Sequence, residues 1–268
     1  MGIYMKCVIL CGGKGTRMKE ETEFKPKPMV NIGKMPILWH IMKIYAHYGV
    51  KEFILCLGYK GEMIKDYFLR YRELTNNFTL DMSSGKEKII VNHCDSKKID
   101  DWKITFVDTG EENMTGSRIA QIKDYLGEDE EFFLTYGDGL SDINIAELYK
   151  FHKLKGKIAT LVAVQPNSYF GVIKTENDLV KTFHEKPMLE DTINGGFFVC
   201  NKKIFDYLNK DPSCVFEQEP LKKLTEDNEL AAFSHKGFWF AMDTAKHAET
   251  LNKMLDSSDA PWMVWEAS

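Results

Sequence analysis

The 268-residue sequence lacks the motifs of two common nucleotide-binding folds. No G-x-x-x-x-G-K-S/T sequence occurs, which argues against a P-loop nucleoside triphosphatase. No G-x-G-x-x-G sequence occurs either, which argues against a dinucleotide fold of the dehydrogenase type. No apolar run reaches the length of a membrane span, and the first residues lack the pattern of a signal peptide. We therefore expect no membrane partner.

An excess of positive charge and paired cysteines are also missing. The formal net charge is −5, so charge gives no reason to expect a nucleic-acid partner. The six cysteines are scattered without a C-x-x-C pair, which supports neither a disulfide framework nor a zinc site and favours a reducing cytoplasm. Hydrophobic residues make up 44% of the chain, which is enough to bury a core in a single large domain, residues 1–268.

The most informative segment is a short hydrophobic strand, Cys7–Leu10, that runs into a loop with three glycines. Glycine lets backbone N–H groups come close to a ligand, and a polyphosphate suits such a loop best. Arg17 offers a planar fork to phosphate oxygens, and Lys27 offers a compact point charge. Together with Lys14 and Lys25 they predict a site for the phosphates of a nucleoside triphosphate, although a glycine-rich loop alone is more often a tight turn.

The first half of the chain, residues 5–165, alternates apolar strands with amphipathic helices. This alternation predicts an α/β fold with a mostly parallel twisted sheet flanked by helices, in which ligands bind outside the carboxyl ends of the strands. We expect strands at Cys7–Leu10, Phe53–Leu57, Ile104–Val107, Phe132–Tyr136 and Ile158–Val164, and helices at Pro36–Tyr48, Glu62–Tyr71, Ser117–Leu126 and Ile143–Leu154.

Two regions break this rhythm. Residues 75–102 are polar with short strand-like pieces, which indicates an inserted hairpin or flap. Residues 166–268 are expected to form a mixed lobe that binds the acceptor substrate. Its predicted elements are strands at Val172–Lys174, Leu179–Phe183 and Gly196–Cys200, and helices at Gln218–Leu224 and Ala245–Leu255.

Two aspartates are candidate ligands for Mg²⁺, which commonly uses one or two carboxylates together with phosphate oxygens. Asp138 follows the predicted strand Phe132–Tyr136 and lies between two glycines, a pattern that is also typical of a hairpin turn. A predicted helix follows it, so the hairpin would lack a second strand. Asp243 directly precedes a predicted helix, where an N-cap role would explain it equally well.

The combination of Gly12-Gly13-Lys14-Gly15-Thr16-Arg17 with Lys25-Pro26-Lys27-Pro28-Met29-Val30 resembles the sugar nucleotidyltransferases and, among them, the glucose-1-phosphate cytidylyltransferases. The resemblance extends over nearly the whole chain, from Pro36–Met42 to Ala260-Pro261-Trp262. It implies a Rossmann-like nucleotidyltransferase fold and transfer of a cytidylyl group from CTP to a sugar 1-phosphate, above all α-D-glucose 1-phosphate. It also implies Mg²⁺ as cofactor and, with the insert, a homo-oligomer.

The resemblance also implies a set of site residues. The catalytic residues are Arg17, Lys27, Asp138 and Asp243, and the last two hold the metal. The nucleotide-binding residues are Leu10, Cys11, Gly12, Gly13, Gly15, Thr16, Arg17, Lys27, Thr115, Arg118 and Gly137. The acceptor-binding residues are Tyr136, Gly171, Glu185, Lys186, Asn194, Gly195 and Trp239.

Several of these residues have a structural interpretation as well. Thr115 could cap a helix, Arg118 could lie on the surface, and Trp239 could be a core aromatic. Glu185 and Lys186 could form a solvated ion pair, and the segment at Asn194 could be a tight turn that opens a strand. Three of the seven histidines, His40, His47 and His184, have no partner at catalytic or metal-ligand spacing, and we interpret them as packing or surface residues.

The sequence departs from the family pattern mainly in the acceptor half. Tyr169 stands where we expect arginine, Phe240-Ala241 replaces a more polar pair, and His184 replaces glutamine. These departures leave open a different phosphorylated acceptor for the same chemistry. A non-catalytic protein that senses nucleotides or sugars on the same fold is a further alternative, because fold alone does not determine function.

Overall fold

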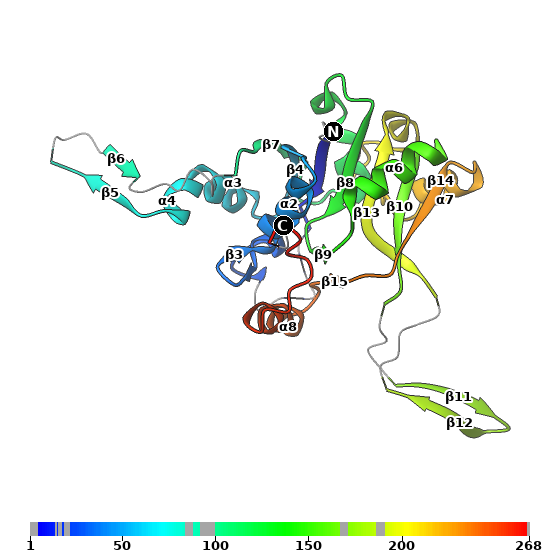
Figure 1. Cartoon of the computed structure of the whole chain (residues 1–268). Coiled ribbons are helices and arrows are strands. Elements are labelled where there is room, and N and C mark those ends of the chain that lie inside the picture. Colours follow the sequence, from blue (N-terminus) through cyan, green and yellow to red (C-terminus); the bar gives the residue numbers. More distant parts are fainter. Residues whose placement is uncertain are drawn as a thin grey trace.

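The computed structural model describes residues 5–13, 15, 18, 22–83, 88–91, 100–166, 171–185 and 191–266. Its centre is a seven-stranded sheet in the order β14-β10-β13-β8-β1-β4-β7 (Figure 1). The strands are β1 (Lys6–Leu10), β4 (Glu52–Leu57), β7 (Lys103–Asp108), β8 (Glu131–Tyr136), β10 (Ala159–Val164), β13 (Ile193–Asn201) and β14 (Leu230–His235).

The sheet is mostly parallel, as predicted. β1 pairs in parallel with β4 and β8, β4 with β7, and β10 with β14. Only β13 runs the other way, antiparallel to both β8 and β10. Because β13 is reversed, its first residues lie at the same sheet edge as the carboxyl ends of its neighbours. The buried strands read as continuous apolar runs because both faces are covered.

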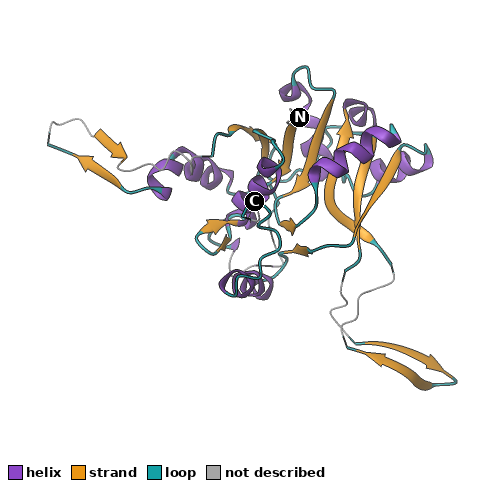
Figure 2. Ribbon diagram, in the orientation of Figure 1, coloured by secondary structure: helices purple, strands orange, loops and turns teal. Residues whose placement is uncertain are grey.

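Helices cover both faces of the sheet (Figure 2). Ile9, Leu55 and Phe133 face one core, which also contains side chains of α2, α6 and α8. Val8, Ile54 and Leu134 face the other, which contains side chains of α5, α7 and two 3-10 helices. The helices are α2 (Ile37–His47), α3 (Gly61–Leu69), α4 (Tyr71–Thr75), α5 (Thr115–Gln121), η4 (Lys123–Leu126), α6 (Ile145–Lys155), η5 (Lys202–Tyr207), α7 (Glu219–Glu226) and α8 (Ala245–Asp256).

Two predicted helices are divided, and one starts later than expected. The segment predicted as Glu62–Tyr71 breaks at Arg70 into α3 and α4. The segment predicted as Ser117–Leu126 turns from α5 into η4 after Ile122. Helix α6 starts at Ile145 because the Asn144 side chain accepts a hydrogen bond from the Glu147 N–H and so caps it there.

Short two-stranded ribbons complete the fold. The hairpins β5–β6 (Phe78–Asp81, Lys88–Val91) and β11–β12 (Val172–Glu176, Leu179–His184) project away from the sheet in Figure 1. The first confirms a hairpin within residues 75–102. β9 (Gly139–Ser141) pairs with β15 (Trp239–Ala241), and β2 (Asn31–Ile32) with β3 (Met35–Pro36), which follow the 3-10 turn η2 (Lys27–Met29).

The C-terminal strands are distributed differently from the mixed lobe that we expected. β13 and β14 complete the central sheet, and of the predicted strands only β11 and β12 stand apart from it. β14 escaped prediction because it is a half-buried edge strand with alternating exposure and two alanines, so it has no continuous apolar run.

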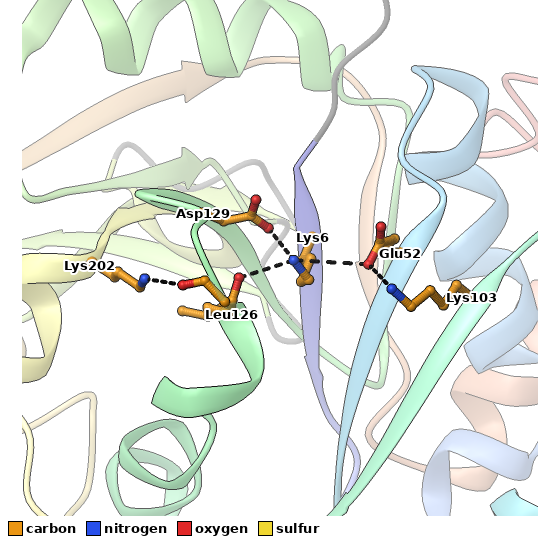
Figure 3. Close-up of polar contacts among 7 residues, drawn as sticks. Lys6, Glu52, Lys103, Leu126, Asp129 and Lys202 are labelled. Carbon is orange, nitrogen blue, oxygen red and sulfur yellow. Dashed lines mark hydrogen bonds and ion pairs between the residues drawn. The ribbon is translucent and has the colours of Figure 1, made fainter.

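Ion pairs connect the amino ends of neighbouring strands, at the edge opposite the glycine loop (Figure 3). The Lys6 ammonium donates to the Leu126 carbonyl at 3.0 Å and pairs with Asp129 at 2.6 Å. Glu52 lies 3.9 Å from Lys6 and pairs with Lys103 at 3.0 Å. These contacts lie at the edge of the sheet opposite the carboxyl ends of β1, β4 and β7. None of the helices in the described ranges is long and apolar enough to cross a lipid bilayer.

Candidate active site

A cavity of about 570 Å³ opens at the carboxyl ends of β1, β7 and β8. Twelve of its lining residues were predicted, and every one of the predicted nucleotide-binding residues in the described ranges is among them. They are Leu10, Cys11, Gly12, Gly13, Gly15, Lys27, Thr115, Arg118, Gly137, Asp138 and Asp243; the acceptor candidate Tyr136 lines this cavity too. Thr16 and Arg17 lie outside the described residues.

Five further residues line the same cavity and were missed: Pro28, Glu111, Glu112, Asn113 and Met114. The last four follow β7, whose carboxyl end lies beside that of β4. The rule that ligands bind beyond the carboxyl ends of parallel strands, applied to this third strand, would have found them.

Arg118 is a buried brace of the glycine loop, with 3% of its surface exposed. Its guanidinium donates to the carbonyl oxygens of Gly12 at 2.9 Å and Leu57 at 3.0 Å, and to Thr109 Oγ1 at 2.9 Å. Burial lowers the pKa of Arg118 from its usual range. The surface interpretation of this arginine is therefore wrong. It holds together the loops that follow β1, β4 and β7.

Gly12 makes this packing possible. A Cβ atom at Gly12 would lie 2.0 Å from Arg118 Nη1, so no other residue fits while the arginine keeps its place. Gly15 has a φ of +59°, in the left-handed region that favours glycine. Glycine is thus needed in this loop at two positions, at Gly12 for close packing and at Gly15 for its backbone conformation.

The two predicted metal ligands meet at one lysine. Lys27 Nζ lies 2.6 Å from Asp138 Oδ2 and 2.9 Å from Asp243 Oδ1. The three side chains come from separate elements: η2, the loop after β8, and the loop after β15. One cation therefore already lies between both carboxylates, and this position is open to the cavity.

The ribbon of β9 and β15 brings the two aspartates together. Ala241 pairs with Gly139 and Trp239 with Ser141, and the Met242 N–H donates to the Asp138 carbonyl at 2.9 Å. Asp138 is thus followed by a strand, but the partner of that strand is β15, so the hairpin interpretation is wrong. The N-cap interpretation of Asp243 is also wrong, because Thr244 caps α8 by accepting from the His247 N–H.

A second cavity of about 280 Å³ adjoins the first. It shares Tyr136, Asp138 and Asp243 with the first cavity. Asn194 and Gly195, at the start of the reversed strand β13, lie there because β13 begins at this edge. Its lining is completed by Thr135, Gly139, Gly196, Phe197, Trp239 and Ala241. Four predicted acceptor-binding residues, Tyr136, Asn194, Gly195 and Trp239, thus line one space.

Trp239 lines this second cavity. Its indole N–H donates to the Gly195 carbonyl at 2.7 Å, and the ring is only partly buried. The structure therefore places Trp239 at a surface that a ligand can reach, beside Asn194, whose Oδ1 accepts from the Gly196 N–H at 2.9 Å. An aromatic face next to amide groups is an arrangement suited to a sugar.

The remaining acceptor candidates lie elsewhere. Gly171 and Glu185 are exposed residues at the base of hairpin β11–β12, and neither lines either cavity. Lys186 and Tyr169 lie outside the described residues. The acceptor roles of Gly171, Glu185 and Lys186 stay predictions.

Thr115 does not cap α5; the N-cap position belongs to Met114. Instead, Thr115 Oγ1 accepts from the Phe216 N–H at 2.9 Å and donates to Glu217 Oε2 at 2.6 Å. Tyr136 donates its hydroxyl hydrogen to the other oxygen of Glu217. Glu217 belongs to the segment that resembles the family, yet its chemistry was missed because its partners are far away in the sequence.

The donor set at Asp138 and Asp243 fits a hard divalent cation. Two carboxylates that converge on a cation position, beside a cavity large enough for phosphate, are what Mg²⁺ uses. Within the described ranges no group of three or more His, Cys, Asp or Glu side chains could hold a metal without further ligands. Phosphate oxygens and water would have to supply the rest.

The three histidines that we interpreted as packing or surface residues line neither cavity. His40 is buried, and burial lowers its pKa to about 4. Its Nε2 bonds the Ile32 carbonyl at 3.0 Å, and Trp262 Nε1 donates to its Nδ1 at 3.3 Å. These partners hold the neutral ring with its proton on Nε2.

A mostly parallel sheet with a glycine loop after its first strand, and with two acids at the same edge, defines a nucleotidyltransferase. Comparison with known proteins agrees. Residues 6–257 match the family model described as nucleotidyl transferase, and the chain belongs to this family. The resemblance inferred from the sequence is thereby confirmed.

The similar proteins are more specific. The chain is 52% identical to the "Probable glucose-1-phosphate cytidylyltransferase" of Bacillus subtilis, over 97% of this chain and 100% of the relative. It is 46% identical to the glucose-1-phosphate cytidylyltransferase of Salmonella typhi, over 98% and 100%. The crystal structure of HddC from Yersinia pseudotuberculosis has the same fold, with a TM-score of 0.68 at 23% identity, over 94% and 100% of the two chains.

Proposed function

We propose that this protein transfers a cytidylyl group from CTP to α-D-glucose 1-phosphate and releases pyrophosphate. The identity of 52% and 46% to two glucose-1-phosphate cytidylyltransferases, along their whole lengths, supports both substrates. The observation that carries the mechanism is the pair of adjoining cavities that share Asp138 and Asp243. Two substrates in these cavities meet at the two carboxylates.

The larger cavity takes CTP. Its glycine loop lines this cavity with Gly12, Gly13 and Gly15, and an added Cβ at Gly13 would meet nothing within 4 Å, so the backbone N–H groups there are open to the phosphates. Lys27 neutralises charge that develops on the α-phosphate. Thr16 and Arg17 are assigned to the β- and γ-phosphates by the resemblance alone. The neighbouring residues after β7, Glu111 to Met114, form the wall left for the ribose and base.

The smaller cavity takes the acceptor. Trp239 offers a ring face to the sugar, and the Asn194 amide and the Gly195 backbone lie beside it. The resemblance assigns the acceptor phosphate to Lys186 and acceptor binding to the preceding Glu185, near which Gly171 lies. A phosphate of the acceptor repels that of the nucleotide, so cations at this boundary are required for the two to approach.

In the reaction, a phosphate oxygen of glucose 1-phosphate attacks the α-phosphorus of CTP. A new P–O bond forms, the bond to the β-phosphate oxygen breaks, and pyrophosphate leaves with that electron pair. Such a transfer needs little covalent work from the protein, so positioning and charge neutralisation dominate. Asp138 and Asp243 would hold Mg²⁺, which when bound neutralises charge on phosphate oxygens. Lys27, already held by both carboxylates, is positioned for the same charge.

Pyrophosphate release tests this proposal. The purified protein is offered CTP, UTP, dTTP, ATP and GTP with magnesium, each against a panel of phosphorylated acceptors that includes glucose 1-phosphate. We expect release with CTP and glucose 1-phosphate only. Release with CTP and another acceptor would keep the chemistry and contradict the acceptor. Tight CTP binding without any release across the panel would support the alternative of a non-catalytic sensor.

We further propose a homo-oligomer in the cytoplasm. Both projecting hairpins carry exposed apolar side chains, and monomers seldom leave such ribbons uncovered. These are Phe78, Leu80, Met82 and Ile89 on the first, and Ile173, Leu179, Val180 and Phe183 on the second. The five cysteines in the described ranges are free thiols, in keeping with a reducing compartment. Light scattering after size exclusion tests the assembly; a monomeric mass at micromolar concentration would contradict it.

A further inference from the structure

We propose that Glu217 is a positioning residue that fixes the wall between the two cavities and thereby links the binding of the nucleotide to that of the acceptor. The inference rests on the proposed function, because it assigns one substrate to each cavity. Glu217 is exposed and lines neither cavity. It acts through two side chains that do, Thr115 and Tyr136.

Tyr136 lies at the boundary between the two cavities. It lines both cavities, and it is the last residue of β8, the strand that leads to Asp138. One face of the ring lies against the backbone of Gly196, where an added Cβ would come within 2.5 Å of the ring atom Cδ2. The ring also contacts Phe198 edge to face, with centroids 6.0 Å apart. Packing therefore holds the inner part of the ring and leaves the hydroxyl end to be held by a hydrogen bond.

Glu217 holds that hydroxyl end. The Tyr136 hydroxyl donates to Glu217 Oε1, and Thr115 Oγ1 donates to Oε2 at 2.6 Å. A carboxylate can accept both hydrogen bonds at once, and bonds to a charged acceptor are about twice as strong as neutral ones. Burial, and next the nearby Glu217 charge, raise the pKa of Tyr136, so its hydroxyl remains a donor.

The contacts form one chain between the two sites. Asn194, which lines the smaller cavity, lies with its Nδ2 3.5 Å from the Tyr136 hydroxyl. Thr115, at the other end, lines the larger cavity and is itself tied to the loop by the Phe216 N–H at 2.9 Å. A change in the position of Glu217 therefore moves a wall residue of each cavity. This arrangement explains why an exposed glutamate in the second half of the chain is bonded to two hydroxyls in the first half.

Variants with kinetics for each substrate test the proposal. We expect Glu217→Ala to raise the KM for CTP and the KM for glucose 1-phosphate by about tenfold each, the size expected for losing hydrogen bonds to a charged group, with a much smaller change in kcat. Tyr136→Phe should raise mainly the KM for glucose 1-phosphate, and Thr115→Val mainly that for CTP. Glu226→Ala, an exposed glutamate in the same segment, is the matched control and should change neither.

Double variants separate positioning from a general loss of structure. If Glu217 acts through Tyr136, then Glu217→Ala with Tyr136→Phe should raise the KM for glucose 1-phosphate no further than Glu217→Ala alone. Full additivity, or a change in only one of the two KM values for Glu217→Ala, would overturn the inference. A fall in Tm with both KM values unchanged would overturn it too.

Calorimetry distinguishes this inference from the proposed function. The affinities for CTP and for glucose 1-phosphate are each measured in wild type and in Glu217→Ala, with magnesium withheld so that no turnover occurs. Weaker binding of both ligands to the variant supports the role of Glu217 even if wild type shows no pyrophosphate release, a result that would defeat only the proposed function. Equal affinities in wild type and variant would overturn the inference whether or not the enzyme turns over.

Discussion

The backbone N–H of Met242 donates a hydrogen bond of 2.9 Å to the carbonyl oxygen of Asp138. This bond continues the ribbon of β9 and β15 past the Ala241–Gly139 pair, so the loops that carry Asp138 and Asp243 are joined through the backbone. The two carboxylates therefore meet at Lys27. Backbone pairing of the ribbon thus sets their relative position, which is what positioning catalysis requires.

Lys27 should be required for full turnover. We expect Lys27→Ala to lower kcat for pyrophosphate release about a hundred- to thousandfold, because one preorganised charge at a reacting group contributes roughly 2.7–4 kcal/mol. Lys27→Arg keeps the charge and serves as the control for the geometry of the site. Near-normal turnover in Lys27→Ala would show that the lysine only neutralises the charges of Asp138 and Asp243 and does not act on the substrate.

Asp138→Asn and Asp243→Asn should each lower turnover about a hundredfold or more and raise the Mg²⁺ concentration needed for half-maximal rate. The reason is that each substitution removes one of the two carboxylate charges that meet at Lys27. Chelation with EDTA should abolish turnover in wild type, and added Mg²⁺ should restore it. A double variant no slower than either single variant would show that both act as one unit. Turnover that survives EDTA would contradict the metal role.

The far end of the β9–β15 ribbon should tune the same site. Ser141 Oγ donates to the Phe238 carbonyl at 2.8 Å and lies 3.2 Å from His235 Nε2. Ser141→Ala removes both contacts, so we expect it to raise the Mg²⁺ requirement by a few-fold while leaving a folded protein, because the register of the ribbon sets the spacing of the two acids. Thr250→Ala, which removes a side-chain hydrogen bond to the Lys246 carbonyl within α8, is the control. An unchanged Mg²⁺ titration would show that the backbone pairs between β9 and β15 are enough to hold the two acids in place.

Stability should fall as the pH drops below about 6.5, in part because of His40. Its pKa is lowered to about 4 in the folded protein by burial, against an ordinary value near 6.5, so the unfolded chain binds the proton more readily. The stabilisation is therefore complete above pH 6.5 and is lost progressively between pH 6.5 and 4. It amounts to about 3 kcal/mol. A proton on Nδ1 would also face the donating Trp262 N–H.

Urea unfolding of wild type and His40→Leu at pH 7.5 and pH 5 measures this effect. We expect the loss of unfolding free energy between the two pH values to be smaller in the variant, although the variant is less stable at pH 7.5. His47→Leu, at an exposed histidine, is the control and should keep the wild-type pH dependence. Equal losses in wild type and His40→Leu would mean that other groups account for the acid sensitivity.

Much of the site was predictable because its parts are local. The run Cys7–Leu10 followed by three glycines signals a buried strand and a close-approach loop within a few residues. Asp138 stands directly after another such strand, and parallel strands bring their carboxyl ends to one edge. The alternation of strands and helices in the first half likewise predicted the sheet, because the spacing of apolar residues along the sequence indicates the type and length of each element.

The features that escaped prediction depend on partners far away in the chain. The resemblance assigned Thr115 and Arg118 to nucleotide binding, but their contacts within the protein were not foreseen. The arginine binds the carbonyls of Gly12 and Leu57, and the threonine binds Glu217. Edge strand β14 has no continuous apolar run that would mark it as a strand. It was missed because its pairing with β10, a distant segment, identifies it. In each case a tertiary contact outweighed the local preference.

The sequence by itself determined the family, the parallel sheet and the position of the glycine loop, because these follow from short motifs and from the periodicity of apolar residues. The tertiary structure decided which charges meet. Asp243 lies beside Asp138 because β15 pairs with β9, and Glu217 reaches Tyr136 and Thr115 because the loop before α7 folds back over α5. Such juxtapositions arise when distant segments pack together, and no local pattern of residues encodes them.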